Sequence, residues 1–457
     1  MIRYYPNKHI VIKKQGDGWG LLINQQTHSS YAINELGVDI WGILEKHPTI
    51  KQVIEHVNNL YSCHNEKSLA EDIESFIHQL ASENLIVKHD TQDVMPFPVS
   101  VYIALTNQCN LTCSYCNYFS YSRDTYKYND RPVNDWLDFI RNFHELGGRN
   151  VCLSGGEPFM YKDIRDIFDL LNKKELTFCV LSNGTNIPAE AINDLCVKNC
   201  CYVQLSLDGA NAFEHERYRG KGTFKTIINN CNRLINAGVN VSVRVTLNDY
   251  NSNAIEEIAD YYFNEIGVNT IQYSWCLPIG RGQRMRNEYI LAIDTRSDVL
   301  KKISVLANTY KGKIVGASGP LADLLQWRMM IDFTSERIDN LPYKGGFLSG
   351  CGCTKHMISA RSDGRLVPCI LLQDMILGDI SDDLLNIWQQ SNILLDLRNR
   401  ENISMYRFEE CASCQYVNSC TGDCPAIPHV YQDNIDVPNY TNCLKTYLKD
   451  GGIVPQA

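Results

Sequence analysis

Cysteine is the residue type with the most unusual placement in this 457-residue chain. Of its 19 cysteines, eleven gather in three groups: Cys109, Cys113 and Cys116; Cys351, Cys353 and Cys369; and Cys411, Cys414, Cys420, Cys424 and Cys443. Thiolates are nucleophiles and metal ligands, so such groups indicate metal or redox chemistry. A chain of this length can bury a large core without disulfides, and its first residues lack the pattern of a signal peptide, so we do not expect a disulfide framework.

The first group, with the spacing Cys109-x3-Cys113-x2-Cys116, is suited to an iron–sulfur cluster. Three thiolates on one short loop can hold three corners of a 4Fe–4S cube, which leaves the fourth iron open to a non-protein ligand. A zinc site that lacks one ligand and a chance group of thiols are the alternatives. The cluster is favoured because this loop follows a predicted strand and a glycine-rich loop, Gly155-Gly156-Glu157-Pro158, follows the next strand.

Alternating strands and helices are expected to position these loops. Strand patterns occupy residues 99–105, 150–154, 178–182, 202–207, 240–247 and 270–275, with helical patterns such as 133–146, 164–173 and 224–237 between them. Six such βα units predict an α/β fold whose parallel sheet forms a partial (β/α)6 barrel of the TIM type. In such barrels the active site lies at the C-terminal ends of the strands, where this sequence carries polar motifs.

The three-cysteine spacing after the first barrel strand resembles that of the radical S-adenosylmethionine (SAM) superfamily. The resemblance implies that SAM chelates the open iron, and that the reduced cluster cleaves SAM into methionine and a 5′-deoxyadenosyl radical. By position, it implies a SAM site of seven residues: Tyr115 and Leu277 beside the adenine; Gly155, Gly156 and Glu157 at the methionine amino group; Ser206 and Arg219 at the carboxylate and ribose. Arg217 is the alternative to Arg219. The glycines would let a ligand approach the bare backbone closely.

The C-terminal cysteines form a second pattern, Cys411-x2-Cys414-x5-Cys420-x3-Cys424 followed by Cys443, which is too regular for chance. A zinc ribbon is the alternative. With the preceding segment 364–369, the region resembles an SPASM domain, which implies two auxiliary 4Fe–4S clusters and hence three in the chain. By the family pattern, the distal cluster would use Cys411, Cys414, Cys420 and Cys443, and the proximal one Cys351, Cys353, Cys369 and Cys424. Cys351 and Cys353 are closer in sequence than is common, so an open iron at the proximal cluster remains an alternative.

The other cysteines are scattered along the chain: Cys63, Cys152, Cys179, Cys196, Cys200, Cys201, Cys231 and Cys276. We expect most of them to be small buried hydrophobic residues. Cys276 differs, because it ends the sixth predicted strand beside Leu277 and its thiol could face the substrate. We therefore name Cys276 as a catalytic candidate.

Residues 1–90 form a separate pattern of three short strands (9–13, 20–24 and 29–33) followed by three amphipathic helices (35–45, 49–61 and 68–84), which is winged-helix-like. The segment resembles a fused PqqD-like recognition element. The resemblance implies that a leader peptide adds as a strand beside the third strand and rests on the third helix, by β-augmentation. A winged-helix DNA binder is the alternative; the acidic residues Glu71, Asp72, Glu74 and Glu83 on the third helix argue against it.

Composition narrows the class further. A net charge of −9 and pI near 5.7 do not favour nucleic-acid binding, and no apolar run approaches the roughly 20 residues of a membrane span. We expect a cytoplasmic protein with four regions: 1–90 for leader recognition, 98–280 as radical SAM core, 281–348 as a mainly helical bridge and 349–457 as SPASM domain. The polar, proline-containing residues 90–98 are interpreted as a linker.

Together, the three parts resemble radical SAM/SPASM enzymes that mature ribosomally made peptides. Within that group, segments 272–276 and 280–282 are most similar to thioether-forming sactisynthases. The resemblance implies a precursor peptide as partner, an external reductant such as flavodoxin or ferredoxin, and a cysteine thioether as product. The alternatives are a carbon–carbon or ether cross-link, epimerisation, oxidation of a protein residue to formylglycine as in sulfatase maturases, and a zinc-containing transcription regulator.

Overall fold

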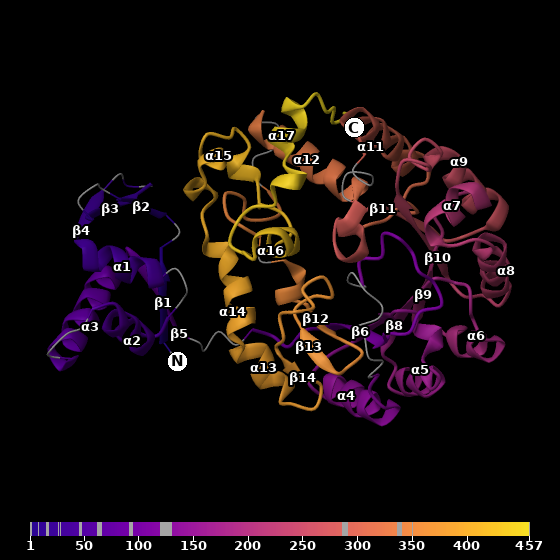
Figure 1. The fold of residues 1–457 in the computed structure, drawn as a ribbon, viewed down its shortest axis with the longest axis horizontal. Coiled ribbons are helices and arrows are strands. Elements are labelled where there is room, and N and C mark those ends of the chain that lie inside the picture. The colour runs from indigo at the N-terminus through magenta and orange to yellow at the C-terminus, as the bar shows by residue number, and fades with distance from the viewer. Residues whose placement is uncertain are drawn as a thin grey trace.

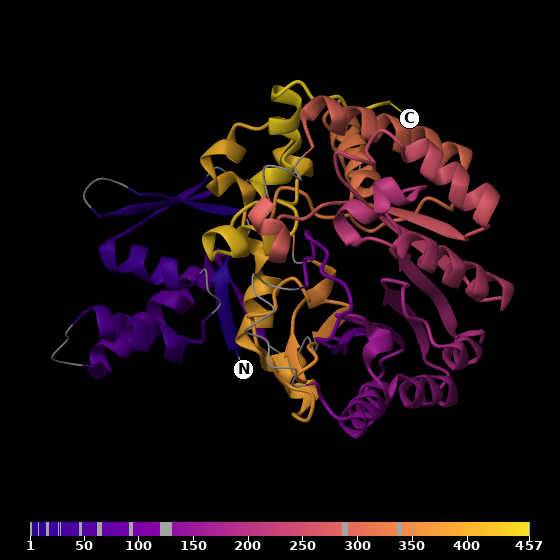
Figure 2. The same cartoon turned by 45° about the vertical axis from the view of Figure 1, so that its right-hand side comes forward.

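A computed structural model describes the whole chain apart from residues 1, 8, 15–17, 26, 28, 45–47, 62–65, 91–94, 119–129, 286–290, 336–340, 350 and 457. Cys63 therefore lies outside the described residues. Figure 1 shows an N-terminal unit at one side, a curved α/β layer at the other, and the C-terminal region between them. Figure 2, turned by 45°, shows the same order.

Six parallel strands form the curved layer: β6 (Ser100–Thr106), β7 (Asn150–Gly155), β8 (Thr177–Ser182), β9 (Cys200–Ser206), β10 (Val241–Leu247) and β11 (Thr270–Trp275). They are neighbours in chain order and every pair is parallel, which confirms the predicted partial barrel. Helices follow the strands: α4 (Val133–Glu145), α5 (Ile164–Lys173), α6 (Ala189–Leu195), α7 (Ala212–Arg219), α8 (Thr223–Asn236) and α9 (Ile255–Asp260), the last continued by a π-helical turn (Tyr261–Ile266). The C-terminal strand ends therefore share one rim.

Helix α4 shows why these helices pack on the sheet. Its apolar residues Trp136, Phe139, Ile140 and Phe143 recur at helical spacing and are all buried in one core with the strands. Burial of such side chains contributes roughly 1.5–3 kcal/mol each. This core fixes the strands, and so the rim at which the predicted site residues lie.

The sheet continues beyond β6 into the C-terminal region. Strand β12 (Met357–Ala360) pairs with β6 in parallel, and β13 (Arg365–Val367) and β14 (Gly378–Asp379) follow antiparallel. The sequence did not predict these strands, because runs of two to four residues carry no readable alternation. One continuous nine-stranded sheet therefore joins the barrel to the region that carries Cys369.

Helices α11 (Ile293–Thr309) and α12 (Pro320–Thr334) confirm the expected mainly helical bridge. The C-terminal region contains five short helices: α13 (Leu384–Gln390), α14 (Asn392–Asn399), α15 (Glu409–Ala412), α16 (Ala426–Gln432) and α17 (Leu444–Lys449). Two of its hydrophobic clusters are small; one has Leu372, Leu397 and Ile427 at its centre, and the other has Leu348 and Met405. Bound metal can order a segment with so little apolar core.

The N-terminal unit has its own core, which includes Tyr4, Leu22, Trp41, Val57 and Ile77. It contains the antiparallel sheet β2 (Ile10–Lys14), β3 (Gly20–Asn24) and β4 (Ser30–Ile33), then α1 (Glu35–Leu44), α2 (Ile50–Leu60) and α3 (Glu66–Ser82), as predicted. The structure adds a pair that the sequence did not predict, β1 (Ile2–Pro6) with β5 (Ile86–Asp90). Strand β4 lies at an edge of its sheet.

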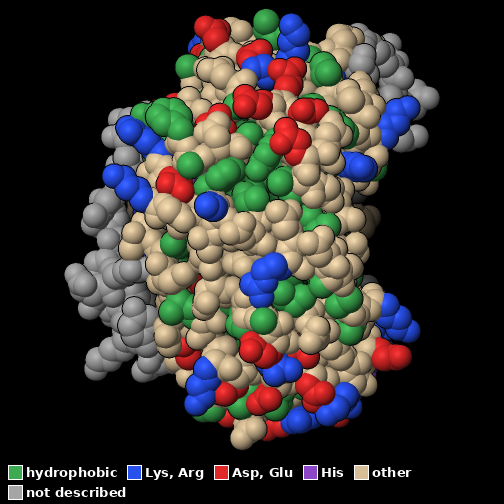
Figure 3. All heavy atoms as spheres, turned by 90° about the vertical axis from the view of Figure 1, so that its right-hand side faces the viewer, with side chains coloured by type: hydrophobic (Ala, Val, Ile, Leu, Met, Phe, Trp, Pro, Cys, Tyr) green, Lys and Arg blue, Asp and Glu red, His purple; other side chains and the backbone are tan. Residues whose placement is uncertain are grey.

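The surface shows no single dominant charge on the face drawn in Figure 3, where acidic and basic side chains intermix and hydrophobic side chains form small groups. Among the described residues, no helix has the length and apolar character needed to cross a bilayer.

Candidate active site at the barrel rim

The loop after β6 carries Cys109, Cys113 and Cys116, and residues that follow other strands of the barrel contact it. The Asn183 side-chain amide, after β8, lies 3.8 Å from the Cys109 sulfur. The backbone N–H of Arg281, in the 3-10 helix Gly280–Met285 after β11, donates to the Cys116 carbonyl at 2.9 Å. Burial raises the pKa of Cys113 to about 12 in the absence of a metal. The three thiols thus lie on one loop at the C-terminal rim, as predicted.

The glycine-rich loop after β7 packs against this cysteine loop. The Gly156 N–H donates to the Thr106 carbonyl at 2.7 Å, and a Cβ on Gly156 would lie 2.2 Å from the Gln108 carbonyl oxygen. Gly155 has φ +134°, and its Cβ would lie 2.5 Å from the Thr106 oxygen. Both glycines are therefore required for contact between two protein backbones.

Glu157 is fully buried next to these glycines. One carboxylate oxygen accepts the Ser182 hydroxyl at 2.8 Å and the Phe159 N–H at 3.2 Å, and the other accepts the Asn183 N–H at 2.7 Å. Burial raises the pKa of Glu157 to about 7. This carboxylate fastens the end of β7 to the end of β8, which also positions Asn183 beside Cys109.

Asp208, two residues after β9, joins two of the predicted SAM residues. Its carboxylate accepts Arg219 Nε at 2.6 Å and Nη2 at 3.1 Å, the Thr246 N–H at 2.8 Å, and the Tyr115 hydroxyl. The Arg219 guanidinium lies 5.4 Å from the centre of the Tyr115 ring. Asp208 was not predicted as a site residue, although it stands in a polar motif at a strand end.

Arg217, the alternative to Arg219, lies 4.4 Å over the ring of Tyr250. Of these two arginines, Asp208 binds Arg219 and holds it beside Tyr115, which belongs to the cysteine loop. Ser206 ends β9 and faces Arg244 of β10 in register. The Leu277 carbonyl accepts the N–H of Ile279 at 2.8 Å, so it belongs to a turn beyond β11.

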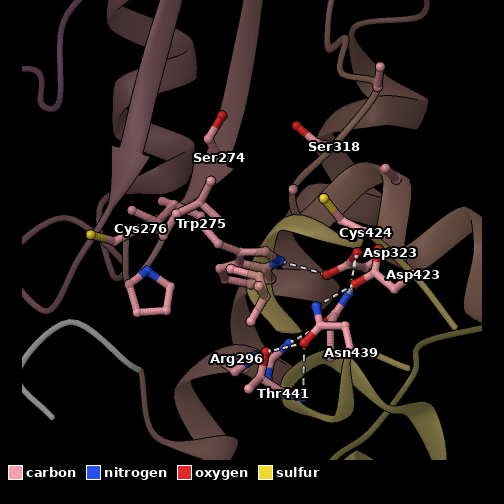
Figure 4. A pocket seen from close by; sticks show the side chains of 18 of the residues that line it. Ser274, Trp275, Cys276, Arg296, Ser318, Asp323, Asp423, Cys424, Asn439 and Thr441 are labelled. Atoms are coloured by element: carbon pink, nitrogen blue, oxygen red, sulfur yellow. Dashed lines mark hydrogen bonds between the residues drawn. The ribbon is translucent and has the colours of Figure 1, made fainter. Parts of the chain in front are cut away.

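A cavity of about 300 Å³ opens between the end of β11, the start of α12 and the C-terminal region. Cys276 and Cys424 both line it, from the barrel and from the C-terminal region respectively, and Figure 4 shows the Cys276 sulfur directed away from Cys424. Burial raises the pKa of Cys276 to about 12, so it is a thiol at neutral pH. The cavity thus borders both the barrel rim and the cysteine-rich region.

Polar side chains brace one wall of the cavity (Figure 4). Trp275 Nε1 donates to Asp323 at 2.6 Å, and Asn442 Nδ2 donates to the other oxygen of Asp323 at 3.0 Å. Arg296 lies 5.2 Å from the Trp275 ring and 5.3 Å from the Tyr447 ring. Burial raises the pKa of Asp323 to about 6. These contacts link β11 and the bridge helices to the C-terminal region.

The eight C-terminal cysteines fall into two neighbourhoods. The Cys353 thiol is hydrogen-bonded with Cys351 and Cys369, and Cys424 lies within electrostatic reach of the last two. The hydrogen bond from Cys353 lowers the pKa of Cys351, which favours the thiolate that a metal requires. Cys411 and Cys420 each lie within electrostatic reach of Cys414 and Cys443. The second neighbourhood therefore consists of Cys411, Cys414, Cys420 and Cys443. Within the described ranges, no three His, Cys, Asp or Glu side chains converge closely enough for a single metal ion.

Three family models match the chain in separate segments. The Radical SAM superfamily matches residues 103–262, coenzyme PQQ synthesis protein D (PqqD) matches residues 20–86, and the iron–sulfur cluster-binding domain SPASM matches residues 351–415. The rim described above lies within the first match, apart from the residues around β11, and the first C-terminal cysteines lie within the third.

Relatives and a solved structure extend the likeness across the chain. The mycofactocin maturase MftC of Mycolicibacterium smegmatis is 26% identical over 72% of this chain and 78% of its own. The sporulation killing factor maturation protein SkfB of Bacillus subtilis is 26% identical over 63% of each chain. SuiB of Streptococcus suis, solved with its precursor peptide SuiA, superposes over 96% of this chain and 100% of its own, with a TM-score of 0.59 and 15% identity. That last likeness concerns the fold.

Proposed function

We propose, on the premise that this chain is a radical SAM enzyme with PqqD-like and SPASM domains, that it installs an intramolecular cysteine thioether in a ribosomally synthesised precursor peptide. The observation that carries the proposal is the cavity at the rim, which Cys276 lines from the barrel and Cys424 lines from the cysteine-rich region. A peptide residue held in this cavity would lie between Cys276 of the barrel and Cys424 of the cysteine-rich region. MftC and SkfB, whose names describe maturation, support a product that is modified after synthesis.

The cluster ligands form part of the proposal. Cys109, Cys113 and Cys116 would hold the cluster that binds SAM. The two C-terminal neighbourhoods would hold a proximal cluster (Cys351, Cys353, Cys369 and Cys424) and a distal cluster (Cys411, Cys414, Cys420 and Cys443), which makes three 4Fe–4S clusters. The hydrogen bonds of Cys353 with Cys351 and Cys369, and the electrostatic proximity of the other thiols, support these two sets of four.

When bound, the reduced SAM-binding cluster and SAM would supply a 5′-deoxyadenosyl radical, and an oxidised auxiliary cluster would supply an acceptor for one electron. A thioether made from C–H and S–H removes two electrons and two protons from the peptide; the radical takes one hydrogen atom, so one electron and one proton remain to be removed. An external reductant such as flavodoxin or ferredoxin would provide the electron that starts the cycle. Among the protein groups, the Cys276 thiol is protonated at neutral pH, so it would contribute as a hydrogen-bond or hydrogen donor and not as a thiolate.

Residues at the rim would orient SAM before the reaction. Asp208 holds Tyr115 and Arg219 together, so the ring and the guanidinium would present one preformed surface to the adenine and carboxylate. Ser206 ends β9 and Leu277 follows β11, the strands on either side of β10, and Gly155, Gly156 and Glu157 stand at the end of β7 on the same rim. Glu157 is fastened by three donors, so we assign it to holding the loop in shape around the methionine end.

The N-terminal unit would capture the leader of the precursor. Strand β4 is at a sheet edge, and Ser30 and Ala32 on it are exposed. An extended peptide can add to such an edge through backbone hydrogen bonds. Residues 1–90, 98–280, 281–348 and 349–457 would then serve as recognition element, radical SAM core, bridge and SPASM domain.

Mass spectrometry of the candidate peptide tests the reaction. Anaerobic incubation with reductant and SAM should yield a peptide lighter by two hydrogen atoms that has lost one thiol reactive to iodoacetamide. The matched control is a peptide in which serine replaces the cysteine that supplies the thioether sulfur, and this peptide should stay unmodified. Loss of two hydrogens with the thiol still reactive would instead indicate a carbon–carbon or ether cross-link, or formylglycine made from serine. Formylglycine made from cysteine would remove the sulfur together with the thiol, and a hydrazide probe identifies formylglycine from either source. Unchanged mass with deuterium uptake from D2O would indicate epimerisation.

A further inference from the structure

Arg400 is a fully buried arginine in the C-terminal region, at the start of the 3-10 helix Arg400–Asn402. Its Nε donates to the Ser349 carbonyl at 2.8 Å, and its Nη2 lies 3.4 Å from the Asp423 carbonyl. Ser349 lies two residues before Cys351, and Asp423 lies one residue before Cys424. The guanidinium therefore ties together the two backbone segments that carry these cysteines.

The surroundings of Arg400 give its guanidinium no direct ion pair among the described residues. Among the described residues, no carboxylate lies within 4.0 Å of the guanidinium, and its Nη1 has neither a hydrogen-bond partner nor access to solvent. The charged or ionisable groups around it are Asp436, Asp423, Cys424 and Cys351. A buried cation is costly unless an anion or acceptors complete its shell. An anionic group between Cys351 and Cys424 would meet that need.

We propose that Arg400 is the electrostatic partner of the proximal cluster. It holds the backbone segments of Ser349 and Asp423 in place, its Nη1 is available to donate to the cluster, and its charge raises the reduction potential of the cluster. This inference rests on the ligand set proposed above. A 4Fe–4S cluster with thiolate ligands is negative and gains one negative charge on reduction, so a buried cation favours the reduced form. Hydrogen bonds to cluster sulfur act in the same direction.

Arg398 provides a matched control two residues away. It is also an arginine whose Nη2 lacks a partner in the interior, but its guanidinium lies 4.4 Å over Trp388 and its Nε donates to the Thr354 carbonyl. Burial alone lowers the pKa of Arg398, with no cysteine among the causes. Arg398→Gln thus removes a nearby arginine charge that has no thiol among the groups acting on it.

The experiment is a redox titration followed by electron paramagnetic resonance in a background with Cys109, Cys113 and Cys116 replaced by Ala, so that only the auxiliary clusters give signals. We expect Arg400→Gln to make one of the two couples at least tenfold harder to reduce, which is about 59 mV for one electron. The other couple should not move, Arg400→Lys should restore most of the shift, and Arg398→Gln should leave both couples unchanged.

Two couples at wild-type potentials in Arg400→Gln would overturn the inference, as would equal shifts in Arg398→Gln. If Arg400→Gln loses about four iron atoms, one cube, retention of that iron in Arg400→Lys supports the role of the charge, and its loss in both variants overturns it. A background protein that shows fewer than two auxiliary couples before Arg400 is changed would contradict the ligand set itself. The two failures are thereby distinguishable.

Discussion

Two fully buried carboxylates, Glu157 and Asp208, hold opposite sides of the cysteine loop. Glu157 accepts three donors and joins the ends of β7 and β8, while Asp208 joins Tyr115 of the loop to Arg219 of α7. Asp208 is balanced by a cation and Glu157 is not.

Stability should fall with rising pH because of Glu157. Burial raises its pKa to about 7, whereas an unfolded Glu titrates near ~4.3. The folded state binds the extra proton between these values, so the stabilisation is complete below about pH 4.3 and is lost as pH rises through about 7, by at most about 4 kcal/mol. The Tm of wild type minus that of Glu157→Gln should be lower at pH 8 than at pH 5.5, because only the wild type loses stability as this carboxyl ionises. Glu256→Gln, at an exposed position of α9, is the matched control for removal of one carboxyl.

Replacement of Cys276 tests its catalytic role. The Cys276 side chain lines the cavity and is not part of the loop of Cys109, Cys113 and Cys116. Cys276→Ala should therefore cleave SAM at a rate within about twofold of wild type. Peptide product should fall at least tenfold, about 1.4 kcal/mol of lost transition-state stabilisation. Deoxyadenosine and peptide product are quantified in the same reactions. Cys201→Ala, at an exposed position on β9, is the control; full product from Cys276→Ala would contradict the role.

The residue-level prediction succeeded for patterns local in sequence and failed for those that only folding creates. The three-cysteine loop and the glycine loop are contiguous, so their spacing could be read directly. The partners of Asp208 lie in a loop 93 residues earlier and in a helix 11 residues later, so no short sequence spacing could predict its role. The glycines were expected to admit a ligand, which stays a prediction; the structure adds that a Cβ on either glycine would meet the backbone of residues 105–108.

At the scale of elements, strand β4 is the clearest recognition feature. The Asn24 N–H donates to the Ser29 carbonyl at 2.9 Å, so in this antiparallel pair the backbone groups of alternate residues, Tyr31 and Ile33, face β3. The N–H and C=O groups of Ser30 and Ala32 then face outward. These are the groups that an added peptide strand would use.

Ala32→Pro should therefore weaken leader binding. Proline removes the outward N–H of Ala32 yet is tolerated on edge strands. Loss of one or two backbone hydrogen bonds corresponds to about 1.4 kcal/mol, or a tenfold higher Kd. Fluorescence anisotropy of a labelled leader peptide measures it, with Ala32→Ser as the control that keeps the N–H. Equal affinities for the two variants would place the leader elsewhere.

Cys424→Ala separates a redox role of the proximal neighbourhood from a purely structural one. Cys424 precedes α16 and lines the cavity, whereas the loop of Cys109, Cys113 and Cys116 is built on β6. We expect the folded variant to cleave SAM but to release deoxyadenosine without cross-linked peptide. Cys196→Ala, at an exposed position, should behave as wild type. A normal yield of product from Cys424→Ala would leave only the structural role.

The barrel strands and the long amphipathic helices were predicted well, because their hydrophobic periods are set by the same core that the structure shows. All six barrel strands and the helices α1–α5, α8 and α11–α12 lie in regions predicted as such. Strands β12–β14 were not predicted, since two to four residues cannot display a period and only pairing with β6 defines them. Strand β1 likewise depends on β5, more than 80 residues away in sequence.

For the whole molecule, the proposed ligand sets predict the iron content. Anaerobically reconstituted protein should bind about 12 iron atoms, three cubes of four. The triple variant with Ala at positions 109, 113 and 116 should retain about two thirds of that iron and lose all SAM cleavage. Iron and sulfide analysis with a deoxyadenosine assay measures both. A triple variant that still cleaves SAM would contradict the assignment, and zinc in place of iron would favour a regulatory protein.

The pairing of β12 with β6 has a consequence for synthesis on the ribosome. Strand β6 is the first strand of the barrel, but its outer neighbour is made about 250 residues later, roughly 10–50 s at bacterial or eukaryotic elongation rates. During that interval β6 is an exposed edge strand, which is a hazard for aggregation. The loop of Cys109, Cys113 and Cys116 then follows a strand that is paired on one side only. Slowing translation between residues 106 and 357 should therefore lower the yield of intact enzyme more than slowing it after residue 380.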